Sequence, residues 1–595
     1  MHNNRNSSQK AKDFKKSMKE LTIYCKPYFI PIIISLILSI ISSILSIIGP
    51  DKLKEITDVI TNGILTGINL NEIKRISIIL LIIYICSAIF GYIDEFIMAT
   101  VTNKFSKSLR KEITKKINKM PLKYFDKNSY GDILSRITND VDTLSQGLNQ
   151  SLSTLVSSIT LLIGSIIMMI ITNGIMALTA IVSSLIGFIF MFSVIKRSQK
   201  YFDLLQTELG NLNGYIEEIY SGHNVVKVYN GVDEANKKFS EINTKLSENV
   251  RKSQFLSGLM HPFMGFIGNF GYVCVCIVGS LLTMNDIISF GVIVAFMIYI
   301  RLFTQPLSRI AQSFSSLQSC AAASERVFEF LAEEEMNNES NFKNNLIKEK
   351  VKGEIEFKHV KFGYNDEKTI IKDFNVKVNP GEKIAIVGPT GAGKTTMVNL
   401  LMKFYDIKDG DILIDKVSTK ELTRENIHDL FIMVLQDTWT FEGTIKENIK
   451  YNNTNVSDKK VEEICKIVGL HHYIKALPNG YDTILTDNDT LSSGQKQLLT
   501  IARGMIKDAP FLILDEATSS VDTRTEELVQ KAMDKLTEGR TSFIIAHRLS
   551  TIKNADLILM MQDGNIIEQG NHDELIKLNG KYAELYNSQF ENVED

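Results

Sequence analysis

A glycine-rich run in the second half of the chain has the residue types that hold a phosphate group. The run "GPTGAGKTT" (388–396) lies between an apolar stretch and a helical pattern, and it matches the spacing G-x-x-x-x-G-K-[ST]. In this pattern backbone N–H groups surround phosphate oxygens, the lysine reaches the β- and γ-phosphates, and the threonine ligates Mg²⁺. We therefore predict that ATP and Mg²⁺ bind at Gly388, Pro389, Thr390, Gly391, Ala392, Gly393, Lys394, Thr395 and Thr396.

Acidic residues follow a second apolar stretch. The run "PFLILDEATSSVD" places Asp515 and Glu516 at the C-terminal end of an expected strand, where open α/β sheets bind ligands. Asp515 suits a Mg²⁺ ligand, and Glu516 suits the base or the positioner of an attacking water. An isolated pair of this kind can instead cap a helix. His547 ends a third expected strand, "TSFIIAH", and either hydrogen-bonds the γ-phosphate or the water, or has a structural role.

Two further residues complete the expected site. Gln436 ends another strand and can bridge Mg²⁺, water and a neighbouring domain. The expected catalytic residues are thus Glu516, His547 and Gln436, and the expected metal ligands are Thr395, Gln436 and Asp515. Tyr364, in "KFGYNDEK", is placed to stack on an adenine ring, with a core aromatic as the alternative.

The first half of the chain must supply a different kind of element. A helix needs about 20 mostly apolar residues to cross a bilayer, and soluble helices are rarely apolar all round for so long. Six stretches qualify, and we predict membrane spans at about 23–49, 73–99, 151–172, 174–195, 256–283 and 285–309. The long segments 100–150 and 196–255 are rich in Lys and Arg, which places them and both termini in the cytoplasm.

The two cytoplasmic segments carry helical spacing, so we expect the membrane helices to continue beyond the bilayer. Each segment then turns, near 124–132 and 220–231, where Gly and Asn suggest short helices that dock on a cytoplasmic partner. Asp94, Glu95 and Arg301 are charges within or near spans; they lie at the interface, line a polar, substrate-facing patch or form an ion pair between spans.

Composition fits this division. The chain has 595 residues, too many for one domain, and a net charge of -2 gives no indication of nucleic-acid binding. The six cysteines are scattered, and the pair Cys274 and Cys276 is read as small buried side chains rather than as a metal pair. We expect a basic cytoplasmic tail (1–20) that is not a signal peptide, an all-α transmembrane domain (21–330), a charged linker (331–352) and an α/β P-loop domain (353–595).

Together these motifs resemble an ABC exporter half-transporter, over residues from about 20 to 590. The resemblance identifies a Walker A motif (388–395), a Q-loop (Gln436), a signature (Leu491–Gln495), a Walker B motif (Phe511–Glu516), a D-loop (Ser519–Asp522) and a switch histidine (His547). The runs "YFDKNSYGDILSRITNDVDTL" and "AAASERVFEFL" are also similar to that family. The resemblance implies a dimer, alternating access, ATP sandwiched between two nucleotide domains, and coupling helices at the two cytoplasmic turns.

In such a dimer the signature reaches a nucleotide held by the other subunit. Ser492 and the backbone of Ser493 and Gly494 then form an anion-binding helix end, with Gln495 and the D-loop Asp522 as further nucleotide contacts. The family's usual signature is L-S-G-G-Q, and Ser493 replaces the first glycine. Because Glu516 and His547 are intact, the chain fits the catalytic half of a heterodimer; the alternative is a tolerated small-residue change in a homodimer.

The expected function is ATP-driven export of hydrophobic or amphipathic compounds (drugs, lipids or peptides) across the plasma membrane, in a bacterium by composition. The alternative is an ABC ATPase that regulates a conductance. An importer is disfavoured because spans and ATPase are fused in the exporter order, and the residues before the first span are too few for a protease domain. The expected partners are a second half-transporter, the lipid bilayer and a small substrate, with no nucleic acid.

Overall fold

The chain forms two compact units, described separately below. The structure is a computed structural model that describes residues 13–342, 344–365, 368–435, 438–453, 455–486, 491–515, 522–546 and 552–590. The first unit comprises residues up to Asn118 and Tyr130–Glu333; the second comprises Lys119–Ser129 and the chain from Glu334 onward.

The first unit is helical. Its elements are α1 (Phe14–Tyr24), η1 (Lys26–Tyr28), α2 (Phe29–Thr66), α3 (Leu70–Ile117), α5 (Tyr130–Ser135), the π-helix η2 (Arg136–Asp140), α6 (Val141–Thr172), α7 (Gly174–Ser221), α8 (His223–Val228), α9 (Val232–Gly258), α10 (Met260–Met284) and α11 (Phe290–Ala332). Helices α3 and α7 continue to Ile117 and Ser221, so the helical continuation expected in the two Lys- and Arg-rich segments is present. That these parts lie beyond a bilayer stays a prediction.

Among the described residues, five helices are long and apolar enough to cross a membrane. They overlap all the expected spans other than 174–195, and three of them begin later than expected, at Lys26, Gly265 and Phe290. That stretch lies within α7, where Gly174–Ile186 is a shorter apolar helix and several of the following side chains are not described. Six spans therefore stay a prediction. Isoleucines on the outer faces of α2 and α3, such as Ile30, Ile33 and Ile82, are exposed, as lipid-facing side chains of a membrane protein are.

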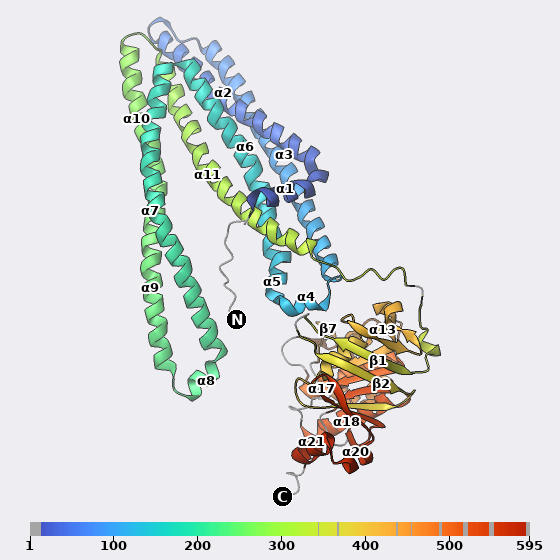
Figure 1. Cartoon of the computed structure of the whole chain (residues 1–595). Helices are drawn as coiled ribbons and strands as arrows, with labels where there is room; N and C mark the ends of the chain where they lie inside the picture. The colour runs from blue at the N-terminus through green and yellow to red at the C-terminus, as the bar shows by residue number, and fades with distance from the viewer. Residues whose placement is uncertain are drawn as a thin grey trace. The chain divides into compact units, whose positions relative to one another are not determined.

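Helix α11 is the centre of the first unit's core. Phe296, Tyr299 and Ile300 are fully buried and pack with Ile47 of α2, Met176 of α7 and further residues of α6 and α10. Figure 1 shows α7 and α9 running side by side with α8 at their tip, and at that end the pair stands apart from α3, α6 and α11. The main packing partners of α9 are α7, α8 and α10.

The three charged residues that the sequence placed near spans have different environments. Glu95 and Arg301 are exposed, whereas Asp94 is buried. The Asp94 carboxylate accepts hydrogen bonds from the hydroxyls of Ser35 on α2 and Ser153 on α6. Asp94 therefore connects three helices through hydrogen bonds to serines, which none of the sequence-based possibilities included, and Glu95 does not share its surroundings.

The second unit is built on a mixed sheet with helices on both faces. The strands are β1 (Ile355–Phe362), β2 (Ile371–Val378), β3 (Lys383–Val387), β4 (Asp409–Ile414), β5 (Val417–Ser418), β6 (Phe431–Val434), β9 (Phe511–Asp515), β10 (Thr541–Ile545), β11 (Leu557–Gln562) and β12 (Asn565–Gly570), in the order β5-β4-β1-β2-β12-β11-β3-β10-β9-β6. β7 (Gly443–Thr444) and β8 (Ile484–Leu485) form a separate pair. The block from β11 through β3, β10 and β9 to β6 is parallel, so the carboxyl ends of these strands share one edge.

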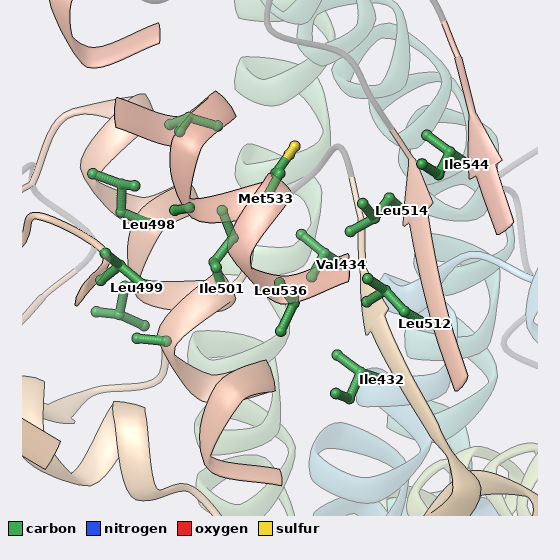
Figure 2. Packing of buried hydrophobic residues seen from close by; sticks show 14 of the residues in the cluster. Ile432, Val434, Leu498, Leu499, Ile501, Leu512, Leu514, Met533, Leu536 and Ile544 are labelled. Atoms are coloured by element: carbon green, nitrogen blue, oxygen red, sulfur yellow. The ribbon is translucent and has the colours of Figure 1, made fainter. Parts of the chain in front are cut away.

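Helices flank this sheet. They are α4 (Leu122–Lys127), η3 (Lys348–Lys350), α12 (Lys394–Leu401), η4 (Thr419–Glu421), α13 (Arg424–Leu430), α14 (Ile445–Lys450), α15 (Asp458–Ile467), α16 (His471–Ala476), η5 (Gly480–Asp482), α17 (Ser493–Lys507), α18 (Thr523–Thr537), α20 (His572–Leu578) and α21 (Lys581–Phe590). Alternate strand residues face two cores. Figure 2 shows one of them, where Leu498 and Ile501 of α17 and Leu536 of α18 pack on Val434 and Leu514 of the sheet.

Candidate active site

The glycine-rich loop joins β3 to α12, as the sequence predicts. Gly388, Gly391 and Gly393 have φ values of 148°, 85° and 101°, which L side chains rarely adopt. A Cβ on Gly388 would also lie 2.2 Å from the Met561 carbonyl oxygen. The loop therefore needs glycine at this position, and it leads directly into the N-terminus of α12, which favours an anion.

Lys394 is the first residue of α12 and folds back onto the loop. Its Nζ donates to the carbonyl oxygens of Gly388, at 2.6 Å, and Pro389, at 3.2 Å. Burial lowers the pKa of Lys394, and the nearby Asp515 carboxylate partly opposes that effect. The ammonium is thus partly desolvated and bound to carbonyls that a phosphate oxygen can replace.

The strand ends bring the acidic residue to the same edge as the loop. In the sheet register Ile545 of β10 pairs with both Ile386 of β3 and Asp515 of β9. Asp515 is the last residue of β9, and its negative charge favours the protonated form of Lys394, which raises the pKa of that lysine against the larger effect of burial. Thr395 is exposed on the first turn of α12. Gln436, Glu516 and His547 lie outside the described residues.

Tyr364 lies beside the same helix. Its hydroxyl is 3.1 Å from Thr396 Oγ1 of α12, and its ring makes edge-to-face contacts with Phe362 and Tyr405, each with centroids 5.0 Å apart. The side chain is half-buried. It is therefore both part of an aromatic cluster and partly open to a ligand, so the two sequence readings for Tyr364 are compatible.

The signature segment forms the N-terminus of α17. Ser492 is the N-cap: its Oγ accepts from the Gln495 amide at 3.3 Å, and its own amide donates to Gln495 Oε1 at 3.0 Å. This capping box fixes the helix start and leaves Ser493 exposed, whereas Gly494 is buried. The N-terminal end of a 15-residue helix is thus presented on the surface, with both Ser492 and Ser493 exposed.

Asp522 caps a second helix, α18. Its carboxylate accepts from the Thr525 amide at 3.0 Å, and this backbone hydrogen bond is the main reason that its pKa is lowered. Within the described residues Asp522 thus has a local structural role; the other D-loop residues, 519–521, lie outside them.

Arg503 is a positioning residue that the sequence reading missed. It lies on α17, and its Nε and Nη1 donate to the carbonyl oxygens of Asn448 at 2.9 Å and Trp439 at 3.3 Å. Its guanidinium also lies over the ring of Phe441. Arg503 thereby links the signature helix to the segment that follows Gln436. An arginine within the amphipathic run of α17 was the available signal.

The described residues fit ATP and Mg²⁺. The loop amides, the α12 N-terminus and Lys394 would hold the phosphates, Thr395 and Asp515 would hold the metal, and Tyr364 would contact the base. Bound Mg²⁺ would neutralise phosphate charge.

Comparisons with known proteins point the same way. Residues 32–307 match the ABC transporter transmembrane region, and residues 371–519 match the ABC transporter domain. A fatty acid ABC transporter ATP-binding/permease protein of Mycobacterium bovis is 41% identical over 521 residues, covering 87% of this chain and 82% of that protein. A probable multidrug resistance ABC transporter ATP-binding/permease protein of Bacillus subtilis is 34% identical over 509 residues, covering 84% of this chain and 75% of that protein.

Proposed function

This chain belongs to the ABC transporter family, and on that premise we propose that it exports hydrophobic or amphipathic compounds as one half of an alternating-access dimer. It is an exporter-type transporter with a transmembrane region and an ATPase domain coupled to transport. The proposal adds the substrate class, Mg²⁺, the dimer, six spans in a bacterial plasma membrane, and cytoplasmic termini.

The exposed arm made of α7, α8 and α9 carries the dimer proposal. None of the six residues of α8 is buried, and Val225, Val228 and Tyr229 are 61%, 75% and 80% exposed. Apolar side chains gathered at a helix tip mark an interaction surface. If α8 couples the membrane helices to ATP hydrolysis, the partner of this surface is the nucleotide-binding domain of a second subunit.

The nucleotide site also calls for a second subunit. The glycine-rich loop and Asp515 share one sheet edge, and the α17 N-terminus presents Ser493 on the surface. A helix N-terminus is an anion site. In the proposed dimer this helix end contacts the γ-phosphate bound by the other subunit, so ATP holds the two domains together and hydrolysis releases them.

The membrane unit and the relatives support an amphipathic substrate. One relative is named for fatty acids, which are amphipathic, and another is named for multidrug resistance. The relatives named as ATP-binding/permease proteins favour transport over regulation of a conductance.

We further propose that the dimer is a heterodimer. This chain keeps Glu516 and His547 but has Ser493 in its signature, so its partner would lack the glutamate and supply an unaltered signature. Expression of the chain alone tests this: substrate-stimulated ATPase activity from a homodimer in proteoliposomes would exclude the heterodimer.

The transport mechanism is tested by Glu516→Gln. We expect this variant to bind ATP and to lose hydrolysis by about a hundredfold or more, because it lacks the base. ATP should then trap the nucleotide domains together, measured by cross-linking in proteoliposomes. Hydrolysis at the original rate would show that Glu516 is not the base.

A further inference from the structure

The short helix α4 is connected to the nucleotide site through Tyr405. The segment Lys119–Ser129, which contains α4, belongs to the same compact unit as the sheet. The Tyr405 hydroxyl donates a hydrogen bond to the Asp126 carboxylate of α4. On its other side, the Tyr405 ring meets the ring of Tyr364 at 87°, with centroids 5.0 Å apart.

Tyr364 is in turn connected to the phosphate-binding helix. Its hydroxyl is 3.1 Å from Thr396 Oγ1 on α12. Phe362 closes the cluster, with its ring 5.0 Å from that of Tyr364 and 5.7 Å from that of Tyr405. Three aromatic rings therefore lie between the loop that binds phosphate and a helix that connects two spans.

The backbone around Tyr405 is firmly held. Arg424 donates to the Lys403 carbonyl oxygen at 3.2 Å and to the Asp406 carboxylate at 3.1 Å. His428 Nε2 lies 2.9 Å from the Met402 carbonyl oxygen. Burial and the adjacent Asp126 raise the pKa of Tyr405, so its hydroxyl stays protonated and able to donate.

A pocket lies beside the contact between Tyr405 and α4. A hollow of about 250 Å³ is lined by Pro121 and Lys123 beside or on α4, by Met336, and by Tyr364 and Tyr405. Elsewhere the α4 segment is held by a 2.8 Å hydrogen bond from the Met336 amide to the Lys119 carbonyl oxygen. Tyr405 is thus a contact of α4 that also touches the expected base-binding ring.

We propose that Tyr405 is a positioning residue that transmits adenine occupancy at Tyr364 to α4 through its hydrogen bond with Asp126. This inference rests on the proposed ATP site. A base stacked on Tyr364 restricts the ring pair, and the restricted Tyr405 hydroxyl holds Asp126 more tightly. The nucleotide's base, and not only its phosphates, then reports to the membrane helices.

Hydrogen exchange on the full-length protein in nanodiscs tests the proposal. ATP is added with EDTA to prevent hydrolysis, and amides of α4 and of the 388–396 loop are followed together. In the wild type we expect ATP to slow exchange in both places, in α4 by roughly three- to tenfold, the scale of the net contribution of one typical hydrogen bond. Tyr405→Phe, which lacks the donor hydroxyl, and Asp126→Ala, which lacks the acceptor, should retain loop protection and lose most of the α4 protection.

Two controls, a second variant and a ligand without a base, distinguish the possible outcomes. Tyr473→Phe is the matched control, because Tyr473 is half-buried and its hydroxyl makes no hydrogen bond within the described part of the chain; it should behave as wild type. Inorganic triphosphate, which lacks a base, should protect the loop but not α4. Unchanged α4 protection in Tyr405→Phe, or equal protection by triphosphate, would overturn the inference. Absence of loop protection by ATP would instead overturn the proposed ATP site.

Discussion

The two short helices α4 and α8 lie at corresponding turns of the chain but have opposite surroundings. α4 buries Tyr124 at 9% exposure and bonds Tyr405 through Asp126. α8 buries none of its residues and exposes Val225 and Val228. The chain therefore provides a packed environment for one helix, whereas the other presents apolar side chains that are costly to leave in water.

This contrast separates contacts that are completed within one chain from surfaces that the proposed dimer would cover. Like α8, Ser493 at the start of α17 is exposed in the single chain. Like α4, the aromatic cluster around Tyr364 and Tyr405 makes its contacts within the chain. Substitutions in α4 and its aromatic cluster should change local stability in an isolated chain. Substitutions in α8 or at Ser493 should change only the activity of the assembled transporter.

The largest effect is expected for Val228→Asp. A charge in place of an exposed valine costs little in the single chain but prevents the tip from entering an apolar contact, where a valine contributes about 1.5–3 kcal/mol. We expect substrate-stimulated ATPase activity in proteoliposomes to fall by about tenfold or more, with unchanged expression. Lys227→Ala, on the same exposed helix, is the control and should retain activity. Full activity of Val228→Asp would show that the α8 tip contacts no partner.

The second prediction concerns the anchor of α4. Tyr124→Ala removes a buried ring, a change that costs about 3 kcal/mol or more for aromatic side chains. We expect α4 to detach, so that trypsin cuts after Lys123 and Lys127 about tenfold faster. Cleavage after Lys227 in α8 is an internal reference and should not change. Leu122→Ala, at a position 39% exposed on the same helix, should resemble the wild type; equal cleavage in Tyr124→Ala would mean that the ring does not anchor α4.

The contrast also marks what the sequence could predict. The turn into α12, the apolar strands β3, β9 and β10, and Asp515 at a strand end follow from local patterns, and the structure places them as expected. The different environments of α4 and α8 do not, because both read as polar turns with Gly and Asn. The segment that contains Tyr124 joins a compact unit whose other residues begin at Glu334, and no pattern within the segment indicates this.

The same limit applies to Asp94 and Tyr405. Asp94 and Glu95 are adjacent in sequence, yet one is buried against Ser35 and Ser153 and the other is exposed. Helical periodicity separates neighbouring residues onto different faces, but it does not say which face meets a serine 59 residues away. Tyr405 likewise shows no local signal for its contact with Asp126.

A smaller effect is expected from acid on the stability of the second unit, which contains both α4 and His428. Burial lowers the pKa of His428 below its ordinary value of 6.5, so below about pH 6.5 the unfolded chain binds the proton more readily than the folded unit. The contribution of neutral His428 to the free energy of unfolding is therefore fully present above about pH 6.5, and it declines as the pH falls below that value. The urea concentration at the unfolding midpoint, followed by circular dichroism, should decrease when the pH is lowered from 7.5 to 5.5. His428→Asn should make this decrease smaller. An equal fall in the variant would assign the effect to other groups.

The smallest effect, and the one that bears most on the partner, is expected for Ser493→Gly. Ser493 is exposed at the first position of α17 while Ser492 and Gln495 form the cap, so losing its side chain should barely change stability. In the proposed heterodimer its helix end contacts a nucleotide site without the catalytic glutamate, so restoring glycine should change steady-state ATPase activity by less than about twofold, because the slow site does not set turnover. In a homodimer the same change would act on both hydrolysing sites and should raise activity clearly. Turnover of Ser493→Gly, measured with the chain alone and with its partner co-expressed, therefore decides whether α8 and α17 contact an identical subunit or a different one.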